Sequence, residues 1–189
     1  ESGADVDAGA EGEMCALNIF DSGTEYRGFE GLKNKSAEEA ERAMRRYVGK
    51  AEVKSFYSDN APELIKAAEK RKDPHTTSTP MRSQTNAIAE RTNRTVLDGT
   101  RTILSQSGLP VFWWPFAGRH WCHSHNISIK NGDSAWNRRH QRGHSKGLKI
   151  PFGSLCHFKP DDKTLASMAK FDDRSVPGIF LGYKLHPGG

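Results

Sequence analysis

The chain has 189 residues, of which 35% are hydrophobic and 27% are charged, and its formal net charge is +5. This length can bury a hydrophobic core, and the composition is typical of globular proteins and excludes disordered, fibrous and membrane-spanning classes. The charge is uneven, because residues 81–149 carry 11 Lys/Arg against 3 Asp/Glu, whereas residues 1–80 carry 12 against 16. A basic segment of this size favours a polyanionic partner over a solvated basic surface.

The first part of the chain predicts a hairpin followed by a helix. Residues 1–13 are rich in glycine, alanine and acids and predict a disordered or truncated edge. The apolar run at 14–20 and the alternating segment at 25–33 flank a short turn, so we expect an antiparallel pair of strands. Residues 36–49 predict a helix, because Ser36 and Glu39 form a capping box and the apolar residues share one face.

Alternating strands and helices continue to residue 126. The predicted segments are a strand at 53–58, a helix at 61–70, an extended segment at 75–80, a long helix at 85–106 and an aromatic-rich helix at 111–126. On the long helix, we expect Ile88 and Val96 to lie on the inner face. This order favours an α/β fold, with a mixed sheet flanked by helices, for a core at 14–126.

The rest of the chain predicts two smaller regions. Residues 127–149 are rich in glycine, arginine and histidine and predict a basic linker. Residues 150–189 predict a small β-rich extension, with strands at 150–160 and 175–185 joined by a polar connection. In the linker, Arg138, Arg139 and Arg142 are candidate DNA-phosphate contacts, although such a run is also typical of a solvated basic loop.

Two carboxylates stand out in this pattern. Asp59 ends the predicted strand in "FYSDNAPEL" (56–64), at the rim where functional groups gather in open α/β sheets. An Asp before Pro-Glu is also typical of a helix N-cap. Glu90 lies near the start of the long helix, beside Arg91 and on one face with Arg94 and Arg101. An acid with so many basic neighbours is unusual for a residue that only balances the helix dipole.

Carboxylates on separate elements are suitable ligands for Mg²⁺ or Mn²⁺. Two such ions could stabilise the attacking and leaving oxygens of a phosphodiester displacement. Arg91, Arg94 and Arg101 could then hold the flanking phosphates of a DNA partner. From the residues alone, Asp59 and Glu90 are therefore candidate metal ligands.

Several motifs, in order, carry a family resemblance. They are "KNKSAEEAERAMRRYVG", "FYSDNAPEL", "TSTPMRSQTNAIAERTNRTV", "LPVFWWPFA", "IPFGSLCHF" and "PGIFLGY". Together they resemble the integrase core of a Ty1/copia-type LTR retrotransposon, a part of the Pol polyprotein. The resemblance covers nearly the whole chain from about Met14.

The resemblance implies an RNase H-like fold and a metal-bound D,D,E triad that processes the 3′ ends of element cDNA and joins them to target DNA. Asp59 matches the second member of the triad, and Glu90 matches the third, with thirty residues between them. The first Asp belongs on a strand before 14–20. Asp7 and Asp5 are candidates for it, and a residue upstream of residue 1 is the third alternative.

Other expectations follow from the same resemblance. Asn60 and Asn86 match positions beside the triad and are expected to contact DNA. The resemblance also implies a homo-oligomer in a nuclear integration complex. A catalytically inactive DNA-binding remnant that lacks the first Asp is the alternative function, and another RNase H-like nuclease is a third.

The cysteines and histidines have ordinary alternatives. The three cysteines are an odd number and are far apart in sequence, which favours reduced thiols and an intracellular location. The run "HWCHSH" (120–125) resembles a zinc-ligand set, but no second pair of ligands accompanies it, so we expect a packed or DNA-facing helix end.

Overall fold

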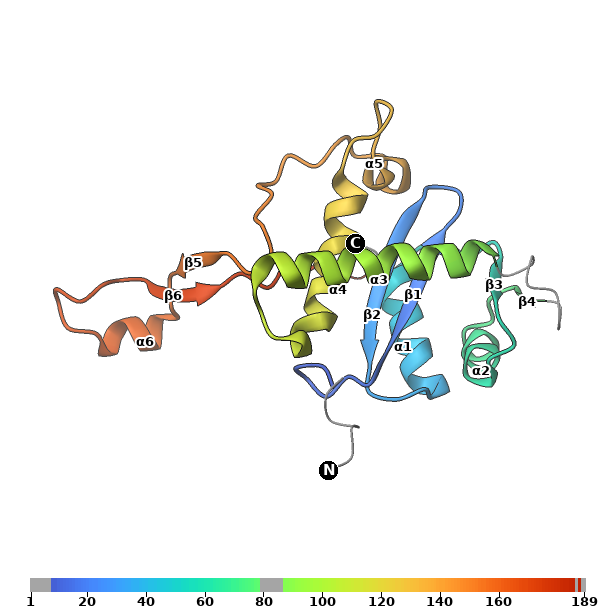
Figure 1. The fold of residues 1–189 in the computed structure, drawn as a ribbon, viewed down its shortest axis with the longest axis horizontal. Coiled ribbons are helices and arrows are strands. Elements are labelled where there is room, and N and C mark those ends of the chain that lie inside the picture. Colours follow the sequence, from blue (N-terminus) through green and yellow to red (C-terminus); the bar gives the residue numbers. More distant parts are fainter. Residues whose placement is uncertain (1–7, 79–86, 186, 188–189) are drawn as a thin grey trace.

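A computed structural model describes residues 8–78, 87–185 and 187. In chain order the elements are β1 (Cys15–Asp21), β2 (Tyr26–Leu32), α1 (Ala37–Val48), β3 (Phe56–Ser58), α2 (Pro62–Arg71), β4 (His75–Thr77), α3 (Ala87–Ser107), η2 (Val111–Trp113), α4 (Trp114–Ile127), α5 (Ala135–His140), β5 (Leu155–Phe158), α6 (Asp162–Ser167) and β6 (Val176–Ile179) (Figure 1). Among the described helices, none combines the length and the apolar character needed to cross a membrane.

The β1–β2 hairpin forms the middle layer of the core, between α1 and α4. The strands are antiparallel, with Cys15 opposite Leu32 and Asp21 opposite Tyr26, as the sequence predicts. Alternate side chains of a strand point to opposite faces. On the α1 face, a Cβ at Gly28 would lie 2.3 Å from the Tyr47 ring, so only glycine fits there. On the other face, Phe29 is buried against α4.

Helix α1 begins where the capping pattern predicts. The Ser36 side chain accepts a hydrogen bond from the backbone N–H of Glu39. The Glu39 carboxylate instead accepts from the Lys33 N–H at 3.1 Å and from Arg42 at 2.8 Å. Glu38 pairs with Lys70 on α2, at 2.6 Å, and this bond lowers the pKa of Glu38.

The predicted single mixed sheet is divided. Strand β3 pairs in parallel with β4, with Phe56 opposite His75, and within the described residues β1 pairs only with β2. The mixed α/β class is confirmed, but the described strands form three two-stranded sheets, and no described strand pairs with both β1 and β3. One apolar cluster spans this division, with buried members Ala40, Met44 and Ala67 and partly buried members Leu17, Ile19, Phe56 and Leu64.

Helices α3 and α4 pack closely against each other. A Cβ on Gly99 would lie 2.1 Å from the Trp121 ring, so glycine allows the two helices to approach. Val96 is 1% exposed and lies on the inner face of α3, as predicted. Ile88 is 66% exposed, so its predicted inward position is wrong: the first turn of α3 extends beyond the core, and Thr92 is the first buried residue.

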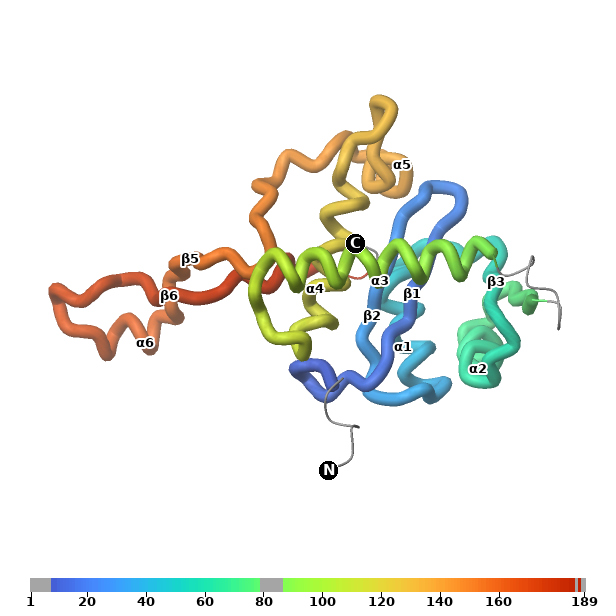
Figure 2. The backbone as a smooth tube through the Cα atoms, in the orientation of Figure 1, coloured from blue at the N-terminus to red at the C-terminus, as the bar shows by residue number. Residues whose placement is uncertain are grey.

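The C-terminal part differs from the prediction in two places. Helix α5, capped by Ser134, forms inside the expected basic linker. The expected small β unit is present as the antiparallel pair β5–β6, but its polar connection contains α6. This β5–α6–β6 segment extends away from the core (Figure 2). Its base is anchored where His120 of α4 contacts the rings of Phe152 and Phe180.

The cluster between α1 and the two sheets gives a stability prediction. Met44 is 4% exposed, so Met44→Ala should leave a cavity and lower the free energy of unfolding by about 2–4 kcal/mol in urea denaturation. Met14 is 52% exposed, so Met14→Ala should change it by less than about 0.5 kcal/mol. Equal effects of the two substitutions would contradict the assignment of Met44 to the core.

Candidate active site and basic surface

Asp59 lies in the loop that follows β3 and is exposed to solvent. Its Oδ1 accepts a hydrogen bond from the backbone N–H of Ala61 at 3.3 Å. Ala61 itself is the N-cap of α2, and no side chain caps that helix, so the N-cap interpretation of Asp59 is wrong. The Asp59 carboxylate therefore retains oxygen atoms that are available to a ligand.

The loop around Asp59 is held by bonds to the neighbouring strand. Asn60 Nδ2 donates to the backbone oxygen of Ser78 at 3.1 Å, just beyond β4. Ser58 Oγ lies 2.9 Å from His75 Nε2, and the His75 ring stacks on Phe56 with a centroid separation of 4.7 Å. Because these contacts join the ends of β3 and β4, they fix the direction in which the chain leaves β3. The Asn60 amide is partly used in this way.

Glu90 lies in the first turn of α3 and is exposed. Within the described residues, its carboxylate makes no hydrogen bond or ion pair. One turn further on, Asn93 Oδ1 accepts from Asn18 Nδ2 at 2.9 Å, which connects this end of α3 to β1. The N-terminal end of α3 lies on the same side of the molecule as β3 and β4 (Figure 1). Two accessible carboxylates, Asp59 and Glu90, are thus present on this side.

These two carboxylates are the candidate metal ligands that the structure describes. Nowhere in residues 8–78, 87–185 and 187 do three or more His, Cys, Asp or Glu side chains form a group that could hold a metal ion. Asp7 and Asn86, like Asp5, lie outside the described residues. The oxygen-only chemistry of Asp59 and Glu90 is suited to Mg²⁺ or Mn²⁺, and a third ligand would have to come from elsewhere.

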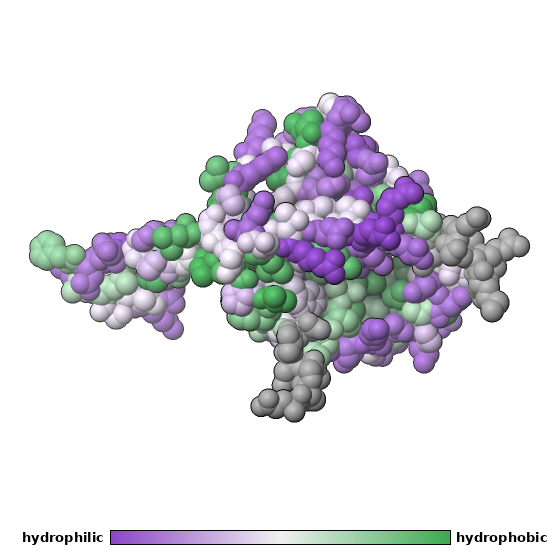
Figure 3. Space-filling model, viewed as in Figure 1, coloured by the Kyte–Doolittle hydropathy of each residue, from purple (hydrophilic) through white to green (hydrophobic). Residues whose placement is uncertain are grey.

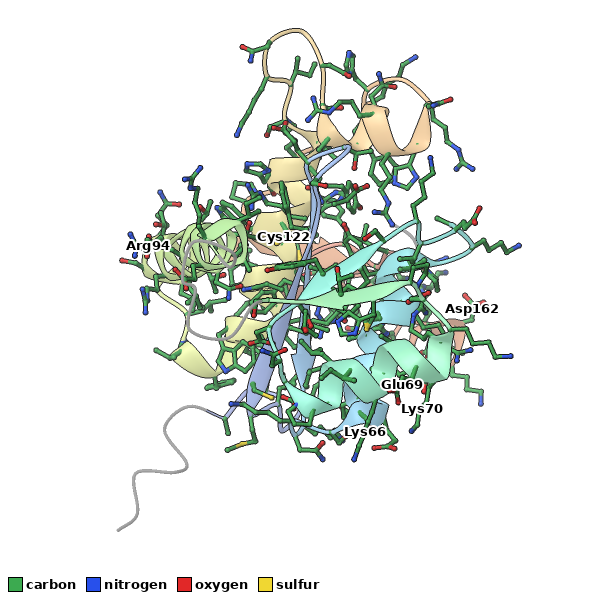
Figure 4. All side chains as sticks on the ribbon, turned by 90° about the vertical axis from the view of Figure 1, so that its right-hand side faces the viewer. Lys66, Glu69, Lys70, Arg94, Cys122 and Asp162 are labelled. Carbon is green, nitrogen blue, oxygen red and sulfur yellow. The ribbon has the colours of Figure 1, made fainter. Side chains whose placement is uncertain are left out.

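The exposed face of α3 carries the basic residues. Arg91, Arg94 and Arg101 are all exposed, and Arg101 also pairs with Asp98 at 3.2 Å, across side chains that are 74% and 62% exposed. Such an exposed pair contributes little to stability. A hydrophilic band follows α3 across this face (Figure 3), and Arg94 projects outward from the helix (Figure 4). This surface is available for an anionic partner.

The three predicted arginines after α4 have different environments. Arg142 is exposed. Arg138 donates to the Thr24 carbonyl at 3.0 Å and to Glu25 at 2.6 Å, so it binds the β1–β2 turn to α5.

The prediction that Arg139 contacts DNA is wrong, because its guanidinium is enclosed by protein. The Arg139 side chain is 12% exposed and lies 4.6 Å from the Tyr26 ring centroid and 4.5 Å from that of Tyr47. It also donates to the Tyr47 carbonyl at 2.7 Å. Burial raises the pKa of both tyrosines, so both rings remain neutral partners for the cation. The sequence signal that could have indicated this role is the pair of tyrosines on β2 and α1.

The histidines and cysteine of the "HWCHSH" run have separate partners. Cys122 is 3% exposed, lies in the interior (Figure 4), and burial raises its pKa to about 12. Burial lowers the pKa of His123 and of His125 to about 4, so both are neutral near pH 7. His125 lies against Trp121 and His123 against Tyr183, with ring separations of 5.1 Å and 4.8 Å. Of the two expectations for this run, a packed helix end or a DNA-facing one, these contacts agree with the packed helix end.

Helix α4 also makes an edge contact that no sequence pattern predicts. Asn126 is 1% exposed, and its amide bonds both the N–H and the C=O of Arg27 on β2, at 2.9 Å and 2.8 Å. In this way one side chain takes the place of a neighbouring strand at the outer edge of β2. Asn126 is almost a hundred residues from Arg27 in sequence, and no local pattern identifies such a pair.

The chain is similar in sequence to two retrotransposon proteins of plants. No family model matches the chain. It is 30% identical over 118 residues to the retrovirus-related Pol polyprotein from transposon TNT 1-94 of Nicotiana tabacum, covering 58% of this chain and 8% of that protein. It is 26% identical over 141 residues to the retrovirus-related Pol polyprotein from transposon RE1 of Arabidopsis thaliana, covering 70% and 9%. The chain thus spans less than a tenth of the length of these curated relatives.

The contrast between Arg139 and Arg142 can be measured directly. Arg139→Met removes an enclosed cation and its bond to the Tyr47 carbonyl, so it should lower the free energy of unfolding by about 2 kcal/mol. Arg142→Met removes the same charge from an exposed position and should change it by less than about 0.5 kcal/mol. Chemical denaturation of both variants tests the difference, and an unchanged stability of Arg139→Met would refute the structural role.

Proposed function

We propose that this chain, a homologue of the Pol polyproteins of copia-type plant retrotransposons, is the catalytic core of an integrase. Such a core would process the 3′ ends of element cDNA and transfer them to target DNA in the nucleus, as part of a homo-oligomer. One observation carries the proposal: Asp59 and Glu90, on separate elements, present exposed carboxylates on one side of the molecule, and Glu90 adjoins a basic helix face.

The arrangement of the strands supports an RNase H-like fold. An antiparallel pair, β1–β2, and a parallel pair, β3–β4, lie on either side of a division that α1 covers with its apolar face. We propose that a further strand occupies this division, joins the two pairs into one mixed sheet and ends in the first Asp of the triad. Asp5, Asp7 or an Asp from a neighbouring part of a Pol polyprotein could supply it.

The roles of the described residues follow from their positions. Asp59 and Glu90 would hold Mg²⁺ or Mn²⁺, which when bound would stabilise the charge that develops on the phosphodiester oxygens. Arg91, Arg94 and Arg101 would contact backbone phosphates and so place the DNA along α3. Asn60 would stabilise the loop that presents Asp59, because its amide bonds the Ser78 carbonyl. Arg142 and Asn86 remain proposed DNA contacts.

A catalytically inactive DNA-binding remnant is the second candidate. It requires only the exposed basic face of α3, with Arg91, Arg94 and Arg101, and no complete triad. Both candidates predict salt-dependent binding to DNA. Only the integrase predicts cleavage and joining that require a divalent metal ion.

The first test of the integrase concerns Glu90. In a longer Pol fragment that joins DNA ends, Glu90→Gln should reduce strand transfer by about 100-fold or more, because it removes a metal ligand at the reacting phosphate. The affinity for DNA should stay within about twofold, since the protein retains its phosphate contacts. Strand transfer is measured with labelled oligonucleotide ends, and affinity is measured by fluorescence anisotropy.

The matched control is Glu69→Gln, on the outer face of α2 (Figure 4), which loses the same charge from another exposed helix position, also beside basic residues, and should retain activity. Strand transfer that survives in Glu90→Gln would remove Glu90 from the active site. If the unsubstituted longer fragment binds DNA but does not cleave it with Mg²⁺ or Mn²⁺, the protein is a catalytically inactive DNA-binding remnant and the integrase proposal is refuted.

The second test concerns the α3 surface. Arg94→Gln should weaken binding to all DNA sequences alike and make the slope of log K against log salt shallower by about 1, as expected for the loss of one phosphate contact. Arg42→Gln serves as the control, because Arg42 is an exposed arginine of α1 that pairs with Glu39. If both substitutions change the slope equally, DNA binds by overall charge and α3 is not the interface.

A further inference from the structure

A cavity of about 390 Å³ lies at the outer edge of β2, away from the candidate active site. Its walls are residues 26–30 of β2, the end of α1 at Arg46 and Tyr47, one face of α4, and the C-terminal segment 181–185. No residue of β3 or α3 lines it. Ligand pockets in proteins occupy about 300–1,000 Å³, so this cavity could hold a small molecule.

Cations outnumber acids in the cavity wall. Arg27, Arg46, Arg119 and Lys184 line it, whereas Glu30 is its only acid among the described residues. Glu30 is already paired with Arg46, at 3.2 Å. Arg119 lies 3.8 Å from Glu13, which is beyond hydrogen-bonding distance, and its side chain is 33% exposed. The cavity therefore has an excess of positive charge, with Arg46 and Lys184 at the exposed rim and Arg119 further inside.

Unpartnered donors are concentrated in the same wall. In the described part of the chain, eight buried side-chain nitrogen or oxygen atoms have no hydrogen-bond partner, and five of them belong to residues that line this cavity. Three of the five are Arg119 Nε, His120 Nδ1 and His123 Nδ1, on one face of α4. A buried polar atom without a partner is destabilising, so such a concentration calls for an acceptor.

The two histidines can serve an anion without carrying a charge. Burial lowers the pKa of His120, and burial together with the proximity of His120 lowers the pKa of His123 to about 4. Both rings are therefore neutral near pH 7, and a neutral imidazole still has one N–H to donate. His120 Nε2 lies 3.3 Å from Ser124 Oγ, which leaves its Nδ1 for another partner.

Aromatic rings form the rest of the wall. Tyr26, Tyr47, Phe116 and Tyr183 all line the cavity. Tyr183 is held in place, because its hydroxyl donates to the Leu148 carbonyl at 2.5 Å and accepts from the Ile150 N–H at 2.8 Å. Tyr26 and Tyr47 already lie against Arg139, so the partly buried rings of Phe116 and Tyr183 are the ones suited to contact a flat aromatic group of a ligand. The cavity thus combines flat apolar surfaces with a cluster of anion donors.

We propose that this cavity binds a small aromatic molecule that carries a phosphate, of about the size of a deoxynucleoside monophosphate. The phosphate would lie against Arg119, Lys184 and the imidazole N–H groups, and the ring would lie against the aromatic wall. A phosphate suits this wall because its several oxygens can accept from more than one donor at once. The proposal does not depend on the integrase activity, because the cavity shares no lining residue with Asp59, Glu90 or the α3 surface.

Isothermal titration calorimetry on the 189-residue chain tests the proposal with three probes at constant ionic strength. The probes are dAMP, deoxyadenosine and inorganic phosphate. We expect dAMP to bind at least about tenfold more tightly than either of its parts, since it engages both walls of the cavity. Inorganic phosphate that binds as tightly as dAMP, or the absence of dAMP binding at millimolar concentration, would overturn the proposal.

Two variants and a control locate the site. Arg119→Gln and Lys184→Gln should each weaken dAMP binding by about tenfold, as expected for the loss of a charge-assisted hydrogen bond. Arg142→Gln removes an exposed arginine that does not line the cavity and should leave dAMP binding unchanged. Lys184 is exposed, so its variant remains informative if Arg119→Gln fails to fold. Wild-type affinity in Lys184→Gln, or an equal loss in Arg142→Gln, would refute the site.

Discussion

The packing of α1 against both small sheets determines where the candidate active site lies. Ala40 and Met44 of α1 contact the hairpin on one side and the β3–α2 unit on the other, and burying a side chain of the size of Met contributes about 1.5–3 kcal/mol. Asp59 follows β3, whereas Glu90 lies on α3, which is bonded to β1 through Asn93. The distance between the two carboxylates therefore depends on how α1 packs against the hairpin and against the β3–α2 unit. Because a displacement of about 1 Å can reduce a rate 100-fold, the proposed reaction would depend on the packing of α1 as well as on the two carboxylates.

The distribution of charge has a structural part and a functional part. The basic middle third of the chain is partly neutralised by the acidic first third, since three of its arginines pair with acids near the hairpin: Arg119 with Glu13, Arg138 with Glu25 and Arg139 with Asp21. Net charge per segment therefore overstates the surface available to DNA. Among the described arginines of this third, those of α3 and Arg142 are exposed to solvent, and only such residues release counterions when they contact phosphate.

Local sequence patterns predicted the elements of this fold well, but not their partners. The hairpin turn and the Ser36 cap depend on residues within a few positions of one another, and both are present. Contacts across the fold were missed, because pairs such as Glu38–Lys70 depend on which faces meet after folding. For the candidate site, the sequence identified Asp59 and Glu90 as candidate metal ligands, but it did not show that Arg139 is enclosed by two tyrosines that come from different elements.

The two edges of the β1–β2 hairpin are covered in different ways. This difference relates the proposed ligand cavity, at the β2 edge, to the proposed active site, at the β1 edge. An open strand edge exposes backbone donors and acceptors, and proteins normally cover or pair such edges. At the β2 edge, Asn126 satisfies both backbone groups of Arg27, and the cavity with its unpartnered donors begins beside it. At the β1 edge, no described strand pairs with β1, although α1 provides an apolar surface that continues from Ile19 to Phe56. The first edge is closed by side chains and is suited to a small ligand, whereas the second is suited to a strand, which is the element that the proposed triad requires.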